Sequence, residues 1–154
     1  MPGRIAYGTY SHDLGRRHPF EVSMLGAAAV VGGSRVLTEP TSGSLETALS
    51  PWLVSIWYVL LSIGALIALS GVFWRSNIVV GLRMEQSGLI MLTSAGSIYG
   101  GALVSSAGWR GLAAAAFLFG FSAACGFRTF DIGRILSRIR TLALSKEAVL
   151  NGED

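Results

Sequence analysis

The sequence lacks charged residues over three long stretches. Thr47 to Trp74, Gln86 to Trp109 and Gly111 to Phe127 contain no Asp, Glu, Lys or Arg and are 28, 24 and 17 residues long. A helix rises about 1.5 Å per residue, so about 20 apolar residues cross the hydrocarbon core of a bilayer. None of the three alternates polar and apolar residues as barrel strands do, and a helix satisfies its own backbone hydrogen bonds. The sequence therefore predicts an all-α membrane protein with three transmembrane helices within residues 51–127.

Cysteine, histidine and paired carboxylates are also scarce. The single Cys125 excludes an internal disulfide. The only histidines, His12 and His18, lie in a segment rich in Gly and Pro, and with Asp13 and Glu21 they match no compact metal site. No nucleophile, base and oxyanion set can be assembled, and no nucleic-acid motif is present. We expect a protein that is not an enzyme and has no cofactor, no metal and no nucleic-acid partner.

The region before the first long run divides into three parts. Residues 1–21 are polar and turn-rich, which predicts a flexible arm. Residues 22–37 include 13 uncharged residues from Val22 to Ser34, a length typical of an interfacial or re-entrant helix. A fourth span over Val22 to Ser34 is the alternative interpretation. Residues 38–50 are expected to form a loop.

The first span has clear end signals. Ser50 before Pro51 predicts a helix start, because Ser caps free amides and Pro at the first position has no N–H to satisfy. Trp52 and Trp57 lie near one end of the run and Trp74 lies at the other. This arrangement is typical of tryptophans that anchor a helix at the two membrane interfaces.

The second span carries small and hydroxylated residues along one side. Gly96 and Gly100 have the small-xxx-small spacing that lets helix backbones approach closely. One interpretation is tight helix packing, with the hydroxyls bonded to their own backbone. The other is a stripe able to line water once several copies associate, and its members would be Ser87, Thr93, Ser94 and Ser97.

The third span and the tail carry two further patterns. A second packing seam of small residues repeats at intervals of four: Ala116, Gly120 and Ala124. Residues 128–154 then predict a basic amphipathic helix that leaves the bilayer along its surface. Its charges are expected to bind anionic lipid headgroups through Arg134, Arg138 and Arg140.

Two charged residues near the start of the second and the end of the third run could form an ion pair. Glu85 and Arg128 would then fix the second helix against the third, whereas the alternative is that both lie at the interface and reach water. With three spans, seven basic residues fall on one side, against Arg35 and Arg110 on the other. The positive-inside rule then places the carboxy terminus in the cytoplasm and the amino terminus outside the cell membrane. The seven are Arg75, Arg83, Arg128, Arg134, Arg138, Arg140 and Lys146.

With its small size, hydroxylated spans and basic tail, the chain resembles the three-span phage holins, and its composition is similar to that of small phage membrane proteins. It departs from the holin pattern in an amino-terminal extension of some fifty residues. The resemblance implies a pore former that permeabilises the cytoplasmic membrane by oligomerisation. The residue patterns themselves favour a structural or accessory subunit of a membrane assembly, joined to copies of itself or to partner membrane subunits.

Overall fold

The computed structural model describes residues 19–37, 50–74 and 76–151, and these residues are almost entirely helical. In chain order the elements are α2 (Pro19–Leu37), α4 (Pro51–Phe73), α5 (Ile78–Ala107), a short 3-10 turn (Gly108–Arg110) and α6 (Leu112–Asn151). No strand occurs in these ranges. The all-α fold is therefore confirmed.

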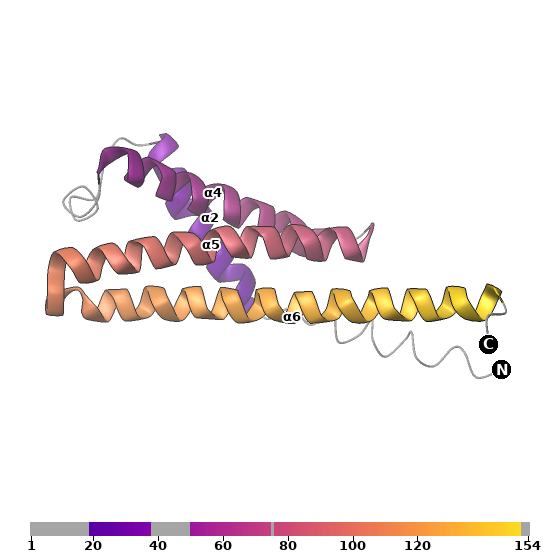
Figure 1. Cartoon of the computed structure of the whole chain (residues 1–154). Helices are drawn as coiled ribbons and strands as arrows, with labels where there is room; N and C mark the ends of the chain where they lie inside the picture. The colour runs from indigo at the N-terminus through magenta and orange to yellow at the C-terminus, as the bar shows by residue number, and fades with distance from the viewer. Residues whose placement is uncertain (1–18, 38–49, 75, 152–154) are drawn as a thin grey trace.

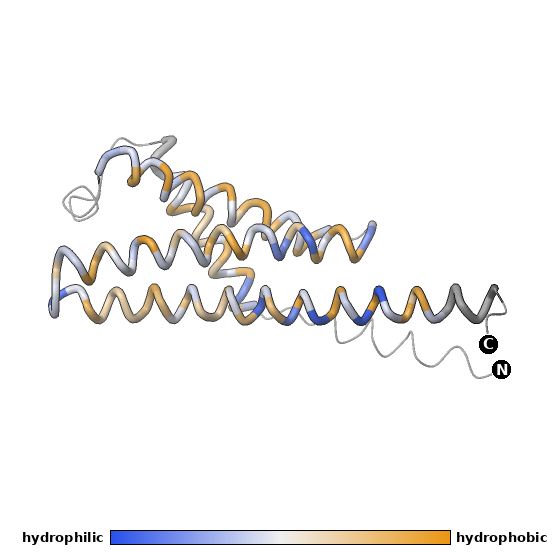
Figure 2. The backbone as a smooth tube through the Cα atoms, viewed as in Figure 1, coloured by the Kyte–Doolittle hydropathy of each residue, from blue (hydrophilic) through white to orange (hydrophobic). Residues whose placement is uncertain are grey.

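Three of the helices are long and apolar enough to cross a membrane. They are Pro51–Phe73, Ile78–Arg110, which includes the 3-10 turn, and Leu112–Ser145. Figure 2 shows apolar residues along all three, with the most hydrophilic residues gathered near the α4–α5 connection and in the second half of α6. Of the described helices, α2 alone is not among the three, and a fourth span over Val22 to Ser34 stays an alternative prediction.

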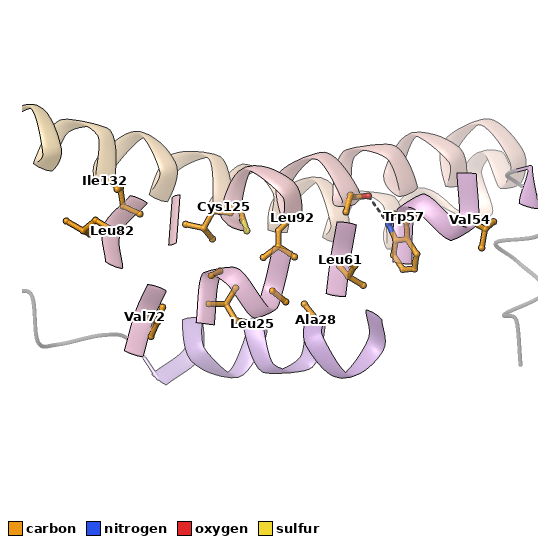
Figure 3. Close-up of a cluster of buried hydrophobic side chains, with 14 residues drawn as sticks. Leu25, Ala28, Val54, Trp57, Leu61, Val72, Leu82, Leu92, Cys125 and Ile132 are labelled. Carbon is orange, nitrogen blue, oxygen red and sulfur yellow. Dashed lines mark hydrogen bonds between the residues drawn. The ribbon is translucent and has the colours of Figure 1, made fainter. Parts of the chain in front are cut away.

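Helix α5 is the centre of the bundle. It packs against α4 on one side and α6 on the other, while α2 packs against α4. Figure 1 shows α4, α5 and α6 running roughly alongside one another and α2 crossing them obliquely. The buried side chains in Figure 3 come from all four helices and include Leu25, Val54, Leu92 and Ile132.

Glycines bring α4 and α5 into close contact. A Cβ atom at Gly88 would lie 2.5 Å from the backbone nitrogen of Ala68 and 2.5 Å from the carbonyl oxygen of Gly64. A Cβ atom at Gly71 would likewise collide with the backbone of Glu85. The two backbones touch because these positions carry no side chain, as is usual where lipid provides no hydrophobic drive for helix association.

The helix starts follow the expected chemistry only in part. Helix α4 begins at Pro51 as predicted, but the Ser50 side chain makes no capping hydrogen bond. Helix α5 is capped instead by Asn77, whose side-chain oxygen accepts hydrogen bonds from Val79 N at 3.0 Å and Val80 N at 3.3 Å. This cap closes the connection between α4 and α5.

Trp57 is not an interfacial anchor. Its side chain is only 5% exposed, and its indole N–H donates to the carbonyl oxygen of Ala95 on α5 at 2.9 Å. Its ring also lies 5.0 Å from that of Tyr99. Trp57 is on the α5-facing side of α4, whereas Trp52 and Trp74 are exposed.

Two expected boundaries shift. Helix α2 begins at Pro19, so residues 19–21 belong to a helix and not to the arm, while the rest of the arm and residues 38–49 of the loop lie outside the described residues. Helix α6 continues through Phe127 without a break and is 40 residues long. At 1.5 Å per residue this is about 60 Å, roughly twice the hydrocarbon thickness of a bilayer. Its last turns extend beyond the ends of α4 and α5 (Figure 1).

Candidate functional site: an ion cluster between α2, α5 and α6

Three helices each contribute one charged residue to a single cluster. Arg128 on α6 donates from Nε to Glu85 Oε1 on α5 at 2.9 Å, and its Nη2 atom lies 2.9 Å from the same oxygen. Glu21 on α2 places Oε1 3.4 Å from Arg128 Nε. The Glu85 side chain is fully buried, whereas those of Glu21 and Arg128 are 25% and 36% exposed. The cluster is therefore accessible from the protein surface between α2 and α6.

Glycine packing explains how Glu85 comes to be buried. Gly71 of α4 lies against the backbone of Glu85, and Gly81 and Gly88 also face α4, one turn to either side. A carboxylate held this far from water is costly unless a charged partner hydrogen bonds to it. The guanidinium group supplies that partner with two N–H groups in a fixed fork. The cluster thus ties α6 to α5 at a defined register.

The sequence pointed to two members of the cluster and missed the third. The sequence indicates Glu85 and Arg128, because each interrupts or borders an apolar run. It places Glu21 in the predicted flexible arm, beside His12, Asp13 and His18 as conceivable metal ligands, and those three residues lie outside the described residues. Its place in the first turn of a helix that starts at Pro19 was the available signal.

An apolar groove of about 280 Å³ begins at this cluster. Glu21 and Arg128 line it, together with apolar side chains from the same three helices. On α6 the lining runs back from Arg128 to Phe121, about two helical turns toward the middle of the span. The other lining residues are Phe20, Met24, Leu25, Leu89, Ala124 and Cys125.

The first predicted packing seam lies inside the protein. Gly96 and Gly100 are buried on the α6-facing side of α5. A Cβ atom at Gly96 would collide with the Ser122 hydroxyl, and one at Gly100 would lie 3.1 Å from the ring of Phe119. These two glycines hold α5 against α6.

The second predicted seam lies on the exposed side of α6 in the described part of the chain. Ala116, Gly120 and Ala124 are all exposed, and nothing lies within 4 Å of a Cβ atom placed at Gly120. Helix α6 contains small residues around its whole circumference, so spacing by four could not identify the side that packs. The side of α6 that is buried carries Ala115, Ser122, Cys125 and Ile132.

The hydroxyl stripe of α5 faces outward and is largely bonded to its own helix. Ser87, Ser94 and Ser97 are exposed, and Thr93 is half-buried. Ser87 donates to Met84 O at 2.9 Å, Ser94 to Ile90 O at 3.0 Å and Thr93 to Leu89 O at 2.8 Å. Thr93 also reaches the Ser122 carbonyl on α6 at 3.5 Å. For Ser87, Thr93 and Ser94, this bonding agrees with the first of the two interpretations.

The arginines expected to bind lipid headgroups are accessible. Arg134, Arg138 and Arg140 are exposed, and Arg134 lies over the ring of Phe130, 4.5 Å from its centroid.

Across the described part of the chain, no group of three or more His, Cys, Asp or Glu residues could hold a metal ion. Comparison with protein-family models, with curated proteins and with solved structures gave no match.

Proposed function

We propose that this protein is a multi-pass membrane protein with a structural or accessory role, in which α4, α5 and α6 cross the bilayer. The observation that carries the proposal is the length of α6, which exceeds what a crossing needs and extends the chain beyond the bundle (Figure 1). A helix of this kind offers a docking element to a membrane partner or to a second copy. The excess of basic residues on this side supports a cytoplasmic carboxy terminus. The external amino terminus expected from the sequence is not part of the proposal, because the ion cluster places Glu21 at the level of Arg128.

A truncation separates insertion from docking. A chain ending at Arg140 keeps Ile135, Leu136 and Ile139, the last α6 side chains that pack against the core. It loses the extension that carries Leu142 and Leu144, which are 69% and 57% exposed. We expect membrane insertion and thermal stability to be unchanged and assembly to be lost.

The measurement is the mass of the protein extracted from its membrane into nanodiscs, before and after truncation. The double substitution Leu142→Ser and Leu144→Ser keeps the full length of the helix and removes only its exposed apolar side chains. It should abolish assembly in the same way as the truncation. If the full-length protein has the mass of one chain, or if the truncated chain assembles equally well, the docking role is wrong.

A holin-like pore former is the second candidate, and the outward-facing small residues favour it. Gly120 has open space around it, and Ser94 and Ser97 are exposed on α5. Lateral association through these surfaces would place hydroxyls along a water path between copies. We expect timed expression to collapse the membrane potential, and Gly120→Leu to change the timing while leaving the single chain folded. Harmless expression at a high level would count against this role.

A further inference from the structure

The groove beside the ion cluster combines an apolar lining with a charged end. Its apolar residues include Leu25, Leu89 and Phe121, and its charged end is formed by Glu21 and Arg128. Arg134, which is exposed, follows Arg128 by six residues, or about 9 Å along the helix. In the proposed membrane orientation the charged end therefore lies just inside the headgroup level, and the apolar end lies deeper.

Glu21 brings an acceptor to the groove that the protein does not fully use. Its Oε1 atom is buried, and no hydrogen-bond donor among the described residues reaches it with good geometry. Arg128 approaches to 3.4 Å, but its Nε and Nη2 groups point to Glu85 at 2.9 Å. The Glu21 side chain as a whole is 25% exposed and lines the groove, so its carboxylate can accept hydrogen bonds from a ligand that carries N–H groups and positive charge.

Arg128 provides hydrogen-bond donors that can bind an anionic group. A guanidinium group has five N–H donors, and the bonds to Glu85 use those on Nε and Nη2. Because its side chain is 36% exposed, the remaining donors can reach a phosphate group at the mouth of the groove. A carboxylate and a guanidinium side by side thus match a headgroup with an ammonium and a phosphate a few atoms apart.

We propose that the groove between α2, α5 and α6 binds one phosphatidylethanolamine molecule. The ammonium group donates hydrogen bonds to Glu21, the phosphate accepts from Arg128, and one acyl chain lies along Leu25, Leu89 and Phe121. Phosphatidylcholine fits the apolar part equally well but has no N–H to donate. Phosphatidylglycerol brings a net negative charge next to Glu21. The site therefore selects the lipid by its headgroup.

The test is native mass spectrometry of the full-length protein, released from nanodiscs that contain the three lipids in equal amounts with identical acyl chains. A charge-assisted hydrogen bond corresponds to a preference of about tenfold for phosphatidylethanolamine over phosphatidylcholine. Glu21→Gln should reduce this preference to near unity, because it removes the charge and keeps the shape. Asp131→Asn, which neutralises an exposed carboxylate one turn beyond Arg128 and outside the groove lining, should leave it unchanged.

A second pair of variants protects the test against misfolding of α2. Ala124 lines the groove and is exposed, so Ala124→Leu fills the acyl site without touching the core, while Ala123→Leu changes the neighbouring exposed position outside the lining. Only Ala124→Leu should lose the retained lipid. Equal retention of the three lipids by the unmodified chain, or no retained lipid, overturns the inference. It depends on the proposed residence in the bilayer, and a chain that is soluble without detergent would instead refute the proposed function itself.

Discussion

Glu85 is the one charged side chain in the described structure that is fully buried, so its stability depends on its bond to Arg128. In Glu85→Ala, Arg128 keeps only the more distant Glu21 as a carboxylate partner among the described residues. Breaking a buried pair costs about 3–5 kcal/mol, and the partial exposure of Arg128 lowers this to roughly 1–3 kcal/mol. We expect a lower midpoint in thermal unfolding of the detergent-solubilised protein.

Two variants show whether the charge pair itself causes the loss. Glu85→Gln retains a hydrogen-bond acceptor and should lose less stability than Glu85→Ala. Asp131→Asn changes a carboxylate on the exposed surface of α6 and should leave the midpoint unchanged. If Glu85→Ala has the same midpoint as the unmodified protein, the ion cluster does not hold α5 to α6.

At the scale of helices, the contact between α4 and α5 depends on the absence of side chains. Gly88→Ala would place a Cβ atom 2.5 Å from the backbone of Ala68, and backbone atoms can move only if the helices separate. We expect a loss of about 1–3 kcal/mol, the usual cost of overpacking. Gly101→Ala on the same helix meets nothing within 4 Å and should be neutral or slightly stabilising. Equal unfolding midpoints for the two variants would contradict this account of the interface.

The helices themselves were predictable from the sequence, because apolar runs without charge determine them almost alone. The sides that pack were harder to predict. Gly64 and Gly71 are seven residues apart, as are Gly81 and Gly88, and these two spacings were the available signal for the α4–α5 contact. The spacing of Ala116 and Gly120 was equally regular, yet that side of α6 is exposed. Spacing within one helix does not say which neighbour lies opposite.

The end of the third helix could not be predicted for a related reason. The charged residues after Phe127 indicated that the apolar run ends, and the sequence does not say whether a helix bends there or continues. Ile132, Leu136 and Ile139 continue the side of α6 that faces α5, so packing keeps the helix straight. Glu21 escaped prediction because its partners lie more than sixty residues away in the sequence.

At the scale of the whole molecule, the proposed topology is testable by labelling single cysteines in intact cells. Cys125 is buried, and Cys125→Ser provides a background without a thiol. Ala107→Cys at the α5–α6 turn should react with a membrane-impermeant maleimide. Ser145→Cys on the extended part of α6 should react only after the membrane is permeabilised. The reverse pattern, or reaction of both sites in intact cells, would reject the orientation.

The short connection between α4 and α5 bears on how the chain is made. Only four residues separate Phe73 from Ile78, and the glycine surfaces on the two helices meet directly. We expect the pair to leave the translocation machinery as a preassembled hairpin, with α6 joining afterwards and closing over Glu85. During synthesis, Glu85 would then lie in the bilayer before Arg128 reaches it. Quality-control proteases would recognise the incomplete protein during this interval.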